Sequence, residues 1–418
     1  MQYVEHPRYG RGVVIESRYN GLELRIKFED GITRWIRREF VRFLSKAPVL
    51  EKCKRAKLTM PAGKFRAVGI IEALRMGVVP LGQIEEFTVG REDELGRIKD
   101  WLDNPQAGTL QIVGEYGTGK THLLNCIYLL ALREGWAVSY VGLDHMENPP
   151  YRPRSVYGSI INSFRFGEKG EGDFRKFLQK IAMNKNTHEI LEHPLLGKIL
   201  RKIREDEVDE DDWEWIEGKL SKRYQKYNHS TSASIYCNIL SGIGWAAKKL
   251  GLKGFLVLFD EAENVDLVQY RNQFKKGWNF LSGLVLLSNN TKSLLWEDIL
   301  YTSSGYIGEE TRLQYYGFRT DIRFAWRIPS NLKLVFAFTP GDLVNEPPFD
   351  SVERVELEHL RAHHFNELLE KIKTIYKEAY DFEVANEELR KFEFPPHTRS
   401  FIKACVEAMD ILRLGGTR

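Results

Sequence analysis

The stretch GEYGTGKTHLL, residues 114–124, has the residue types and spacing to hold a phosphate group. Its first eight residues fit the pattern G-x-x-x-x-G-K-[ST] at every fixed position, and an apolar stretch precedes them. Glycines allow the backbone to wrap around a phosphate with its N–H groups pointing inward, and the start of the following helix adds partial positive charge. The stretch predicts a binding loop for a nucleoside triphosphate. The alternative is a glycine-rich turn that fits by chance.

Two side chains of this loop have separate expected roles. Lys120 is expected to reach the β- and γ-phosphates, and Thr121 to place its hydroxyl on a Mg²⁺ ion that binds with ATP. We therefore expect ATP and Mg²⁺ as the ligands. The residues expected to contact the nucleotide are Gly114, Glu115, Tyr116, Gly117, Thr118, Gly119, Lys120, Thr121 and His122.

A pair of carboxylates follows an uninterrupted apolar stretch at residues 255–259. If that stretch is a strand, Asp260 and Glu261 lie at its carboxyl end, where open α/β sheets bind their ligands. Asp260 is expected to hold Mg²⁺, directly or through water, and Glu261 to polarise the attacking water as general base. Glu263 is a second, weaker candidate for the base. An acidic turn after a buried strand is the alternative explanation.

Two further residues are candidates for sensing the γ-phosphate. Thr339 follows the apolar stretch 334–338, and a polar side chain at that strand end would lie beside the carboxylates. Arg399 begins the last predicted helix, from which an arginine could reach back to the phosphates. The alternatives are an ordinary strand-end cap for Thr339 and a surface arginine for Arg399.

These side chains need a scaffold that brings distant segments together. From Thr88 onward the chain alternates between apolar stretches and helical patterns, which predicts an α/β fold with a parallel sheet covered by helices on both faces. Residues 120–133 have the pattern of a helix, and residues 362–414 that of a small helical bundle. The expected strands lie in TLQIVG (109–114), AVSYVGLD (137–144), GFLVLFDEAENV (254–265), LKLVFAFTPG (332–341) and VERVELEHL (352–360).

The first 44 residues have a different pattern, in which apolar and polar residues alternate over short stretches. Strands are expected at 13–16, 22–28 and 32–36. Tyr19-Asn20-Gly21 and Glu29-Asp30-Gly31 contain the Asn-Gly and Asp-Gly pairs that are typical of hairpin turns. The pattern predicts a small all-β sheet or barrel of three to five strands.

The composition, at 43% hydrophobic and 28% charged residues, is typical of a globular protein with a sizeable core. No run of about 18 apolar residues occurs, so we expect no transmembrane helix. The N-terminus lacks the apolar core of a secretion signal. The four cysteines are far apart, as expected for free thiols, and we expect a cytoplasmic protein. They are Cys53, Cys126, Cys237 and Cys405.

The net charge of +3 is unevenly distributed along the chain. Residues 1–60 hold 14 Lys/Arg and 7 Asp/Glu, so this end carries +7 and the remainder carries −4. A basic end on a slightly acidic body suggests an anionic partner for that end. A solvated basic surface without a partner is the alternative.

With the phosphate loop, the carboxylate pair and Thr339, the chain resembles the AAA+ ATPases. Its VGRExEL segment at 89–95 is similar to a box that packs near the adenine in the origin-recognition branch, which implies that Gly90 and Arg91 contact the nucleotide. More narrowly, the chain resembles the ATP-binding proteins of BREX phage-defence systems, the BrxC/BrxD group, and BrxD most closely. The segments that carry this resemblance are RAVGIIEALRMGVVP (66–80), GEYGTGKTHLL, PYRPRSVY (150–157), LFDEAENV, VFAFTPG, VELEHL and PPHTRSFIKACVEAMD (395–410).

The N-terminal region resembles the Tudor/SH3-like module of UvrD/PcrA-type helicases. The shared residues are HPRYGRGVV (6–14) and KFEDG (27–31), and such modules generally bind protein partners or nucleic acid. The expected domains are a Tudor/SH3-like β-barrel at 1–44, a basic linker at 45–64, an AAA+ core at 65–360 with a helical insertion at about 165–250, and a helical lid at 361–418.

The BREX resemblance implies ATP binding and hydrolysis in a multi-protein DNA-processing or defence system, often beside a large helicase. The expected partners are ATP, DNA, and a helicase or another defence-system protein. A homo-oligomer is expected if an arginine of one copy completes the site of another. The candidates for such an arginine, each of which is otherwise surface charge or a contact to nucleic acid, are Arg312, Arg319, Arg323 and Arg327.

Two other functions remain open from the sequence. The first is an ATP-gated scaffold with little turnover, which would recruit a helicase or RNA polymerase. The second is an origin-recognition-like helicase loader. That function calls for a winged-helix domain after the lid, and we expect none in the residues up to Arg418.

Overall fold

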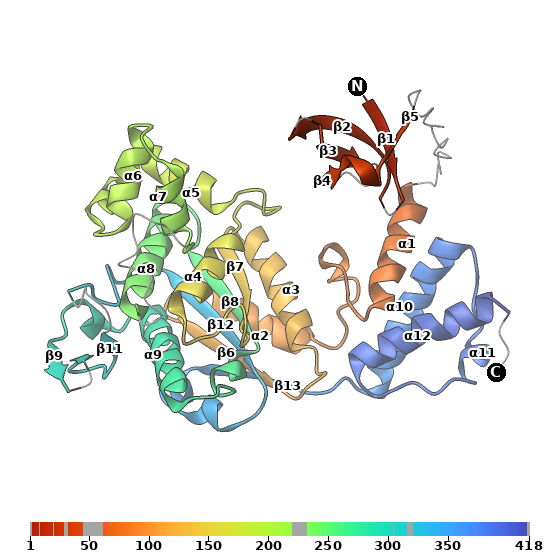
Figure 1. The fold of residues 1–418 in the computed structure, drawn as a ribbon. Helices are drawn as coiled ribbons and strands as arrows, with labels where there is room; N and C mark the ends of the chain where they lie inside the picture. Colours follow the sequence, from red (N-terminus) through yellow and green to blue (C-terminus); the bar gives the residue numbers. More distant parts are fainter. Residues whose placement is uncertain are drawn as a thin grey trace. The chain divides into compact units, whose positions relative to one another are not determined.

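The computed structural model describes residues 2–7, 9–19, 21–28, 32–44, 62–219, 232–303, 305–315 and 321–415 (Figure 1). The chain divides into two compact units, Met1–Ala62 and Gly63–Arg418. Several sequence predictions lie outside the described residues. They are the turn residues Asn20 and Glu29-Asp30-Gly31, most of the linker (45–61), and the side chains of Arg8, Cys53 and Arg319.

The N-terminal unit is a five-stranded antiparallel sheet with the strand order β4-β3-β2-β1-β5, which confirms the predicted all-β character. Alternate residues of β3, Leu24, Ile26 and Phe28, are buried and form a small core with Val4 of β1. A β-bulge between Val14 and Glu16 interrupts the register of β2 against β3. The strands are β1 (Gln2–His6), β2 (Gly10–Arg18), β3 (Glu23–Phe28), β4 (Thr33–Arg37) and β5 (Arg42–Leu44).

The larger unit is built on a five-stranded parallel sheet with the order β13-β6-β12-β8-β7, as the α/β prediction requires. The strand before the phosphate loop (β6) and the strand before the carboxylates (β8) both pair with β12, which lies between them. The carboxyl ends of these three strands therefore meet at one edge of the sheet. The strands are β6 (Thr109–Gly114), β7 (Ala137–Gly142), β8 (Phe255–Asp260), β12 (Leu332–Phe338) and β13 (Glu353–Leu357).

Helices cover both faces of this sheet, because the central strands are apolar on both sides. Leu256 and Leu258 of β8 pack in the same core as α2 and α3. Phe255 and Phe259 face the opposite side and pack with α4, α8 and α9. The bounds are α2 (Glu92–Asp103), α3 (Lys120–Arg133), α4 (Pro153–Asn162), α8 (Ala233–Lys249) and α9 (Arg271–Ser288).

Two insertions extend the α/β core. The first, between β7 and β8, contains α5 (Phe174–Met183), α6 (Leu196–Arg204) and α7 (Glu210–Ile216). The second, between α9 and β12, holds a three-stranded antiparallel sheet that the sequence did not predict, since its strands are short and separated by turns. Its strands are β9 (Ile299–Thr302), β10 (Gly305–Gly308) and β11 (Gln314–Tyr315). In the described part of the chain, no helix is long and apolar enough to cross a membrane.

The C-terminal helices share a core with α1 (Ala62–Arg75), a segment that the sequence grouped with the ATPase core. The buried residues of α1 are Ala67, Ile70, Ile71 and Leu74. Their spacing places them on one helix face, and this face packs against the C-terminal helices. The lid therefore includes α1. Its other helices are α10 (Ala362–Tyr380), α11 (Asn386–Leu389) and α12 (Thr398–Arg413).

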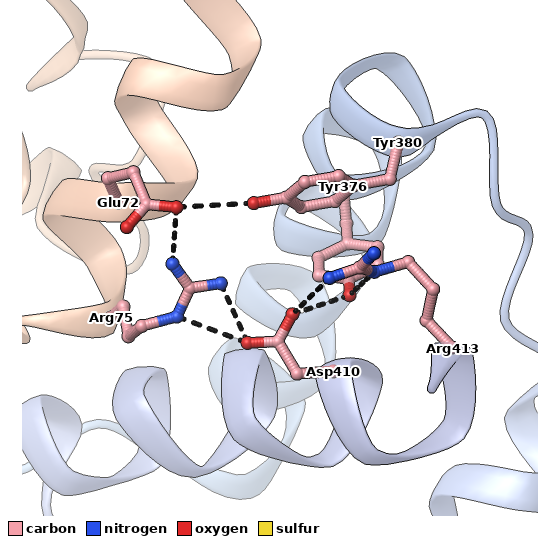
Figure 2. A network of polar contacts seen from close by, with 6 residues as sticks. All are labelled: Glu72, Arg75, Tyr376, Tyr380, Asp410 and Arg413. Carbon is pink, nitrogen blue, oxygen red and sulfur yellow. Dashed lines mark hydrogen bonds and ion pairs between the residues drawn. The ribbon is translucent and has the colours of Figure 1, made fainter. Parts of the chain in front are cut away.

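A polar network fastens α1 to α10 and α12 (Figure 2). The Asp410 carboxylate accepts hydrogen bonds from Nε and Nη2 of Arg75 at 3.1 and 2.7 Å, and from the Tyr376 hydroxyl at 2.7 Å. Arg75 also pairs with Glu72, and Arg413 donates to the Tyr376 oxygen at 2.9 Å. Burial alone would raise the pKa of Asp410, but the hydrogen bonds from Tyr376 and Arg75 and the charge of Arg75 hold it below its usual value.

Candidate nucleotide-binding site

A cavity of about 590 Å³ lies between the phosphate loop, the ends of β8 and β12, and the lid. Gly114 and Glu115 belong to the loop but line a neighbouring hollow instead. Most of the site residues that were predicted from the sequence line this cavity. They are Arg91, Tyr116, Gly117, Thr118, Gly119, Lys120, Thr121, His122, Asp260, Glu261, Thr339 and Arg399.

The phosphate loop connects β6 to α3, in agreement with the predicted strand and helix. Gly117 and Gly119 have φ angles of +86° and +97°, in the left-handed region that other residues rarely adopt. A side chain at either position would strain this backbone. The loop conformation therefore depends on these two glycines, and α3 begins directly after the second of them.

The Lys120 ammonium lies against the loop that precedes it. Its Nζ donates to the backbone oxygens of Gly114 at 2.6 Å and Glu115 at 3.2 Å, and to the Thr339 hydroxyl oxygen at 3.3 Å. Burial lowers the pKa of Lys120, although nearby carboxylates, Glu263 foremost, oppose this shift. A phosphate would supply the negative charge that carbonyl oxygens only partly provide.

Asp260 and Thr121 are adjacent, as the magnesium prediction requires. The Thr121 hydroxyl donates to Oδ2 of Asp260 at 2.7 Å, and the backbone N–H of Glu261 donates to Oδ1 at 3.0 Å. A carboxylate and a hydroxyl oxygen are ligands that suit Mg²⁺, which prefers oxygen and keeps several of its waters. The residues present therefore fit the ion.

Tyr140 is a site residue that the sequence reasoning missed. Its hydroxyl donates to the same Oδ2 of Asp260 at 2.7 Å, from the neighbouring strand β7. Burial, followed by the charge of Asp260, raises the pKa of Tyr140, so its phenol keeps the proton that it donates. A tyrosine near the end of the predicted strand 137–144 was the available signal.

Thr339 lies beside the carboxylates, as its strand-end position predicted. Its hydroxyl donates to Oε1 of Glu263 at 2.5 Å. Glu261 is exposed, and its carboxylate accepts a hydrogen bond from the Asn264 amide at 3.3 Å. Its φ of +55° is unusual for a residue other than glycine and marks backbone strain directly after Asp260.

An apolar wall completes the cavity. Part of it comes from the segment between α1 and α2, and part from the segment after β13 and the lid helices. Apolar walls combined with a few polar groups are typical of pockets that hold a flat organic group such as a nucleobase. The apolar residues of these segments that line the cavity are Val78, Val79, Ile84, Phe87, Val89, Leu360, Leu368 and Ile402.

Arg91 lines the cavity, whereas Gly90 lies against the His364 ring of α10. Arg91 is buried, and its guanidinium donates to the backbone oxygens of Thr118 at 2.8 Å and Glu358 at 2.7 Å. It therefore braces the phosphate loop against the segment after β13. At Gly90 an added Cβ would meet the ring of His364 at 2.4 Å, so this glycine allows α10 to approach closely.

The lid brings Arg399 and His397 to the cavity wall. Arg399 lies in the first turn of α12, where the sequence placed it, and it is exposed. Two of the arginines considered for a contact between copies are engaged within the chain. Arg323 donates to the backbone oxygen of Glu297, and Arg327 pairs with Glu189.

Arg312, the remaining candidate of that set within the described residues, is exposed. It has a φ of +58°.

Residues 64–220 match the family model of the BREX system ATP-binding protein BrxC/D. A comparison with curated proteins finds no match. The matched region contains most of α1 and the phosphate loop, and it ends before Asp260. This similarity supports an ATP-binding protein of a BREX-like phage-defence system. The closer likeness to BrxD, and that of the N-terminal sheet to helicase modules, remain predictions.

Proposed function

We propose that this chain binds ATP with Mg²⁺ in the cavity and hydrolyses it to ADP and phosphate while acting on DNA or on a DNA-bound partner. One observation carries the proposal. Lys120, Thr121, Asp260 and Thr339 come from three separate regions of the chain, and hydrogen bonds connect them at the edge of one cavity. The match to BREX ATP-binding proteins supports the choice of nucleotide.

Each residue has a task in this proposal. The loop N–H groups and Lys120 bind the phosphates, and Thr121 and Asp260 hold Mg²⁺, which would neutralise phosphate charge when bound. Arg399 approaches the phosphates from the lid, and the apolar wall takes the base. A glutamate of the segment after Asp260 accepts the proton of the attacking water, with Glu261 and Glu263 as candidates.

The basic N-terminal end supports the DNA part of the proposal. Residues 1–60 carry +7, and Lys/Arg side chains bind phosphate backbones through charge. We place the protein in the cytoplasm, where ATP and DNA are available, beside a helicase or another protein of the same defence system. Binding of this kind weakens steeply with salt.

The test is the steady-state rate of ATP hydrolysis, measured at low salt without DNA, with duplex DNA and with single-stranded DNA. Stimulation by either DNA, lost in about 200 mM salt, supports the full proposal. Hydrolysis that DNA does not change supports the ATPase part alone. A rate equal to background under every condition contradicts the proposal. A specific activity that rises with protein concentration would indicate a homo-oligomer.

An ATP-gated scaffold is the second candidate function. The observation that favours it is the compact N-terminal unit, whose described residues include none that line the nucleotide cavity and which could serve recruitment. On this hypothesis Glu261→Gln and Glu263→Gln should both behave as wild type in every assay. If either variant retains bound ATP and changes assembly, hydrolysis is part of the function.

A further inference from the structure

Three carboxylates lie at the carboxyl end of β8 or just after it, and each has different hydrogen-bond partners. Asp260 accepts from Thr121 and Tyr140. Glu261 is exposed and accepts from Asn264. Glu263, on the short 3₁₀ helix Ala262–Val265, reaches across to β12 and accepts from Thr339. The three groups are therefore not equivalent, although the sequence places them within four residues of one another.

Glu263 is the carboxylate connected to the phosphate-binding lysine. Its Oε1 accepts from Thr339 at 2.5 Å, and the same Thr339 oxygen accepts from Nζ of Lys120 at 3.3 Å. Its other oxygen, Oε2, is buried and has no hydrogen-bond partner within the described residues. A buried carboxylate oxygen without a donor is unfavourable, and such an atom beside a ligand cavity indicates a role in the bound state.

The Thr339 hydroxyl has a single proton, so it can donate to only one acceptor at a time. In the structure that acceptor is Glu263. A γ-phosphate held by Lys120 would lie within reach of the same hydroxyl and would compete for its proton with more negative charge. When the hydroxyl turns to the phosphate, Oε1 of Glu263 loses this donor and becomes available to a water molecule.

We propose that Glu263, and not Glu261, is the catalytic base, and that Thr339 controls it by exchanging its hydrogen bond from Glu263 to the γ-phosphate. This inference rests on the proposed ATPase function. A water oxygen attacks the γ-phosphorus, the bond to the bridging oxygen breaks, and its electron pair stays on the ADP β-phosphate. The water proton passes to the Glu263 carboxylate and then to the phosphate product.

Glu261 is less suited to this task in the structure. Its side chain is exposed and its carboxylate is turned toward Asn264. Within the described residues it forms no hydrogen bond with Lys120 or Thr339, which bond to each other and, through Thr339, to Glu263. Asn264 in turn donates to the backbone oxygen of Leu143 at 2.7 Å, which fixes the amide. Glu261 is therefore held by the loop that follows β8.

The experiment compares Glu263→Gln with Glu261→Gln, which remove the same charge and keep the same shape. Phosphate release gives kcat, and a fluorescent ATP analogue gives nucleotide affinity. Glu263→Gln should lower kcat by at least about 100-fold, the usual contribution of a base, while affinity changes by less than about threefold. Glu261→Gln should keep kcat within about tenfold of wild type.

A loss of 100-fold in Glu261→Gln, alone or together with Glu263→Gln, overturns the assignment. So does a normal kcat in Glu263→Gln. If Glu263→Gln does not fold, Glu263→Asp keeps the charge but shortens the reach, and it should show the same loss of kcat. Wild-type protein that binds the analogue without releasing phosphate contradicts the proposed ATPase function itself, and this result is distinct from a failure of the Glu263 assignment.

Discussion

The chain contains two polar networks that use similar residues in opposite ways. In the lid, both oxygens of Asp410 accept hydrogen bonds, and its partners Arg75, Tyr376 and Arg413 contact one another or a further partner (Figure 2). At the cavity, one Thr339 hydroxyl oxygen serves both Lys120 and Glu263.

The two networks differ in whether all of their polar atoms have hydrogen-bond partners. The lid network holds elements together. In the cavity network, Oε2 of Glu263 has no hydrogen-bond partner within the described residues, so this network is not complete.

Backbone conformation shows the same contrast. The helices that carry the lid network are regular over Ala62–Arg75, Ala362–Tyr380 and Thr398–Arg413. Beside the cavity network lie Glu261, with a φ of +55°, and the loop glycines Gly117 and Gly119. Strained positions persist at functional sites where the surroundings enforce them. Variants that remove one group from each network should therefore affect different properties.

The largest effect is expected at the cavity, from Lys120→Ala. Removing the ammonium takes away the charge that stabilises the γ-phosphate, so hydrolysis should fall by at least about 100-fold. Thermal stability should change little, because the lysine mainly contacts loop carbonyl oxygens. Phosphate release and a thermal melt give both quantities. Lys99→Ala, at an exposed position on α2, is the control and should match wild type.

Arg75→Met should have the opposite effect. It should lower the free energy of unfolding by more than it raises the activation free energy of hydrolysis. The variant leaves Asp410 without two charge-assisted hydrogen bonds, and these contribute about 1.5–3 kcal/mol to the free energy of unfolding. Urea unfolding measures the loss, and amide hydrogen exchange over α1 locates it. Arg66→Met removes an exposed ion pair with Glu86 and should cost less than about 1 kcal/mol. Equal losses in both variants would contradict the holding role of the lid network.

Tyr140→Phe removes one donor from Asp260 and leaves the ring in place. A hydrogen bond of this kind contributes about 1–2 kcal/mol, so we expect a roughly fivefold to thirtyfold higher Mg²⁺ concentration for half-maximal hydrolysis. The reason is that Asp260 becomes less firmly oriented toward the ion. Tyr270→Phe, at a side chain that is 59% exposed, is the control. An unchanged Mg²⁺ requirement would show that Thr121 and the Glu261 N–H position Asp260 without help from Tyr140.

The smallest effect concerns acid pH and the lid. Because the pKa of Asp410 is lowered on folding, its carboxylate stabilises the fold above the ordinary value of 3.8, and this stabilisation is lost as the pH falls below that value. The melting-temperature difference between wild type and Asp410→Asn should be constant from pH 7 to about 4.5 and shrink at lower pH. A difference that already shrinks between pH 6 and 5 would mean that another group controls the lid.

Much of the scaffold was predictable because strong local sequence signals mark where its strands and helices begin and end. The expected strand 109–114 and helix 120–133 coincide with β6 and α3, since glycines at 114 and 119 end one element and precede the other. The antiparallel strands β9 and β10 could not be predicted in the same way. Their stability depends on contacts such as Glu297, a buried carboxylate that accepts from the Tyr315 hydroxyl at a distance of 2.5 Å.

The sequence predicted which residues belong to the candidate site better than it predicted which of them contact one another. Asp260 beside Thr121 follows from the chemistry of an oxygen-bound ion. The pairing of Thr339 with Glu263 joins two segments that are distant in the sequence, and no local signal specifies which carboxylate Thr339 contacts. Tyr140 was missed because its role depends on the neighbouring strand.

Helix α1 also has a mechanical consequence. Gly77, Val78 and Val79, which come just after its last residue, line the nucleotide cavity, while its first residue, Ala62, ends the N-terminal unit. Fourteen helical residues form a rod of about 21 Å. A lid rotation of about 10° would move the far end of that rod by about 4 Å. A rotation of the lid would therefore be amplified along this helix into a displacement of its first turn.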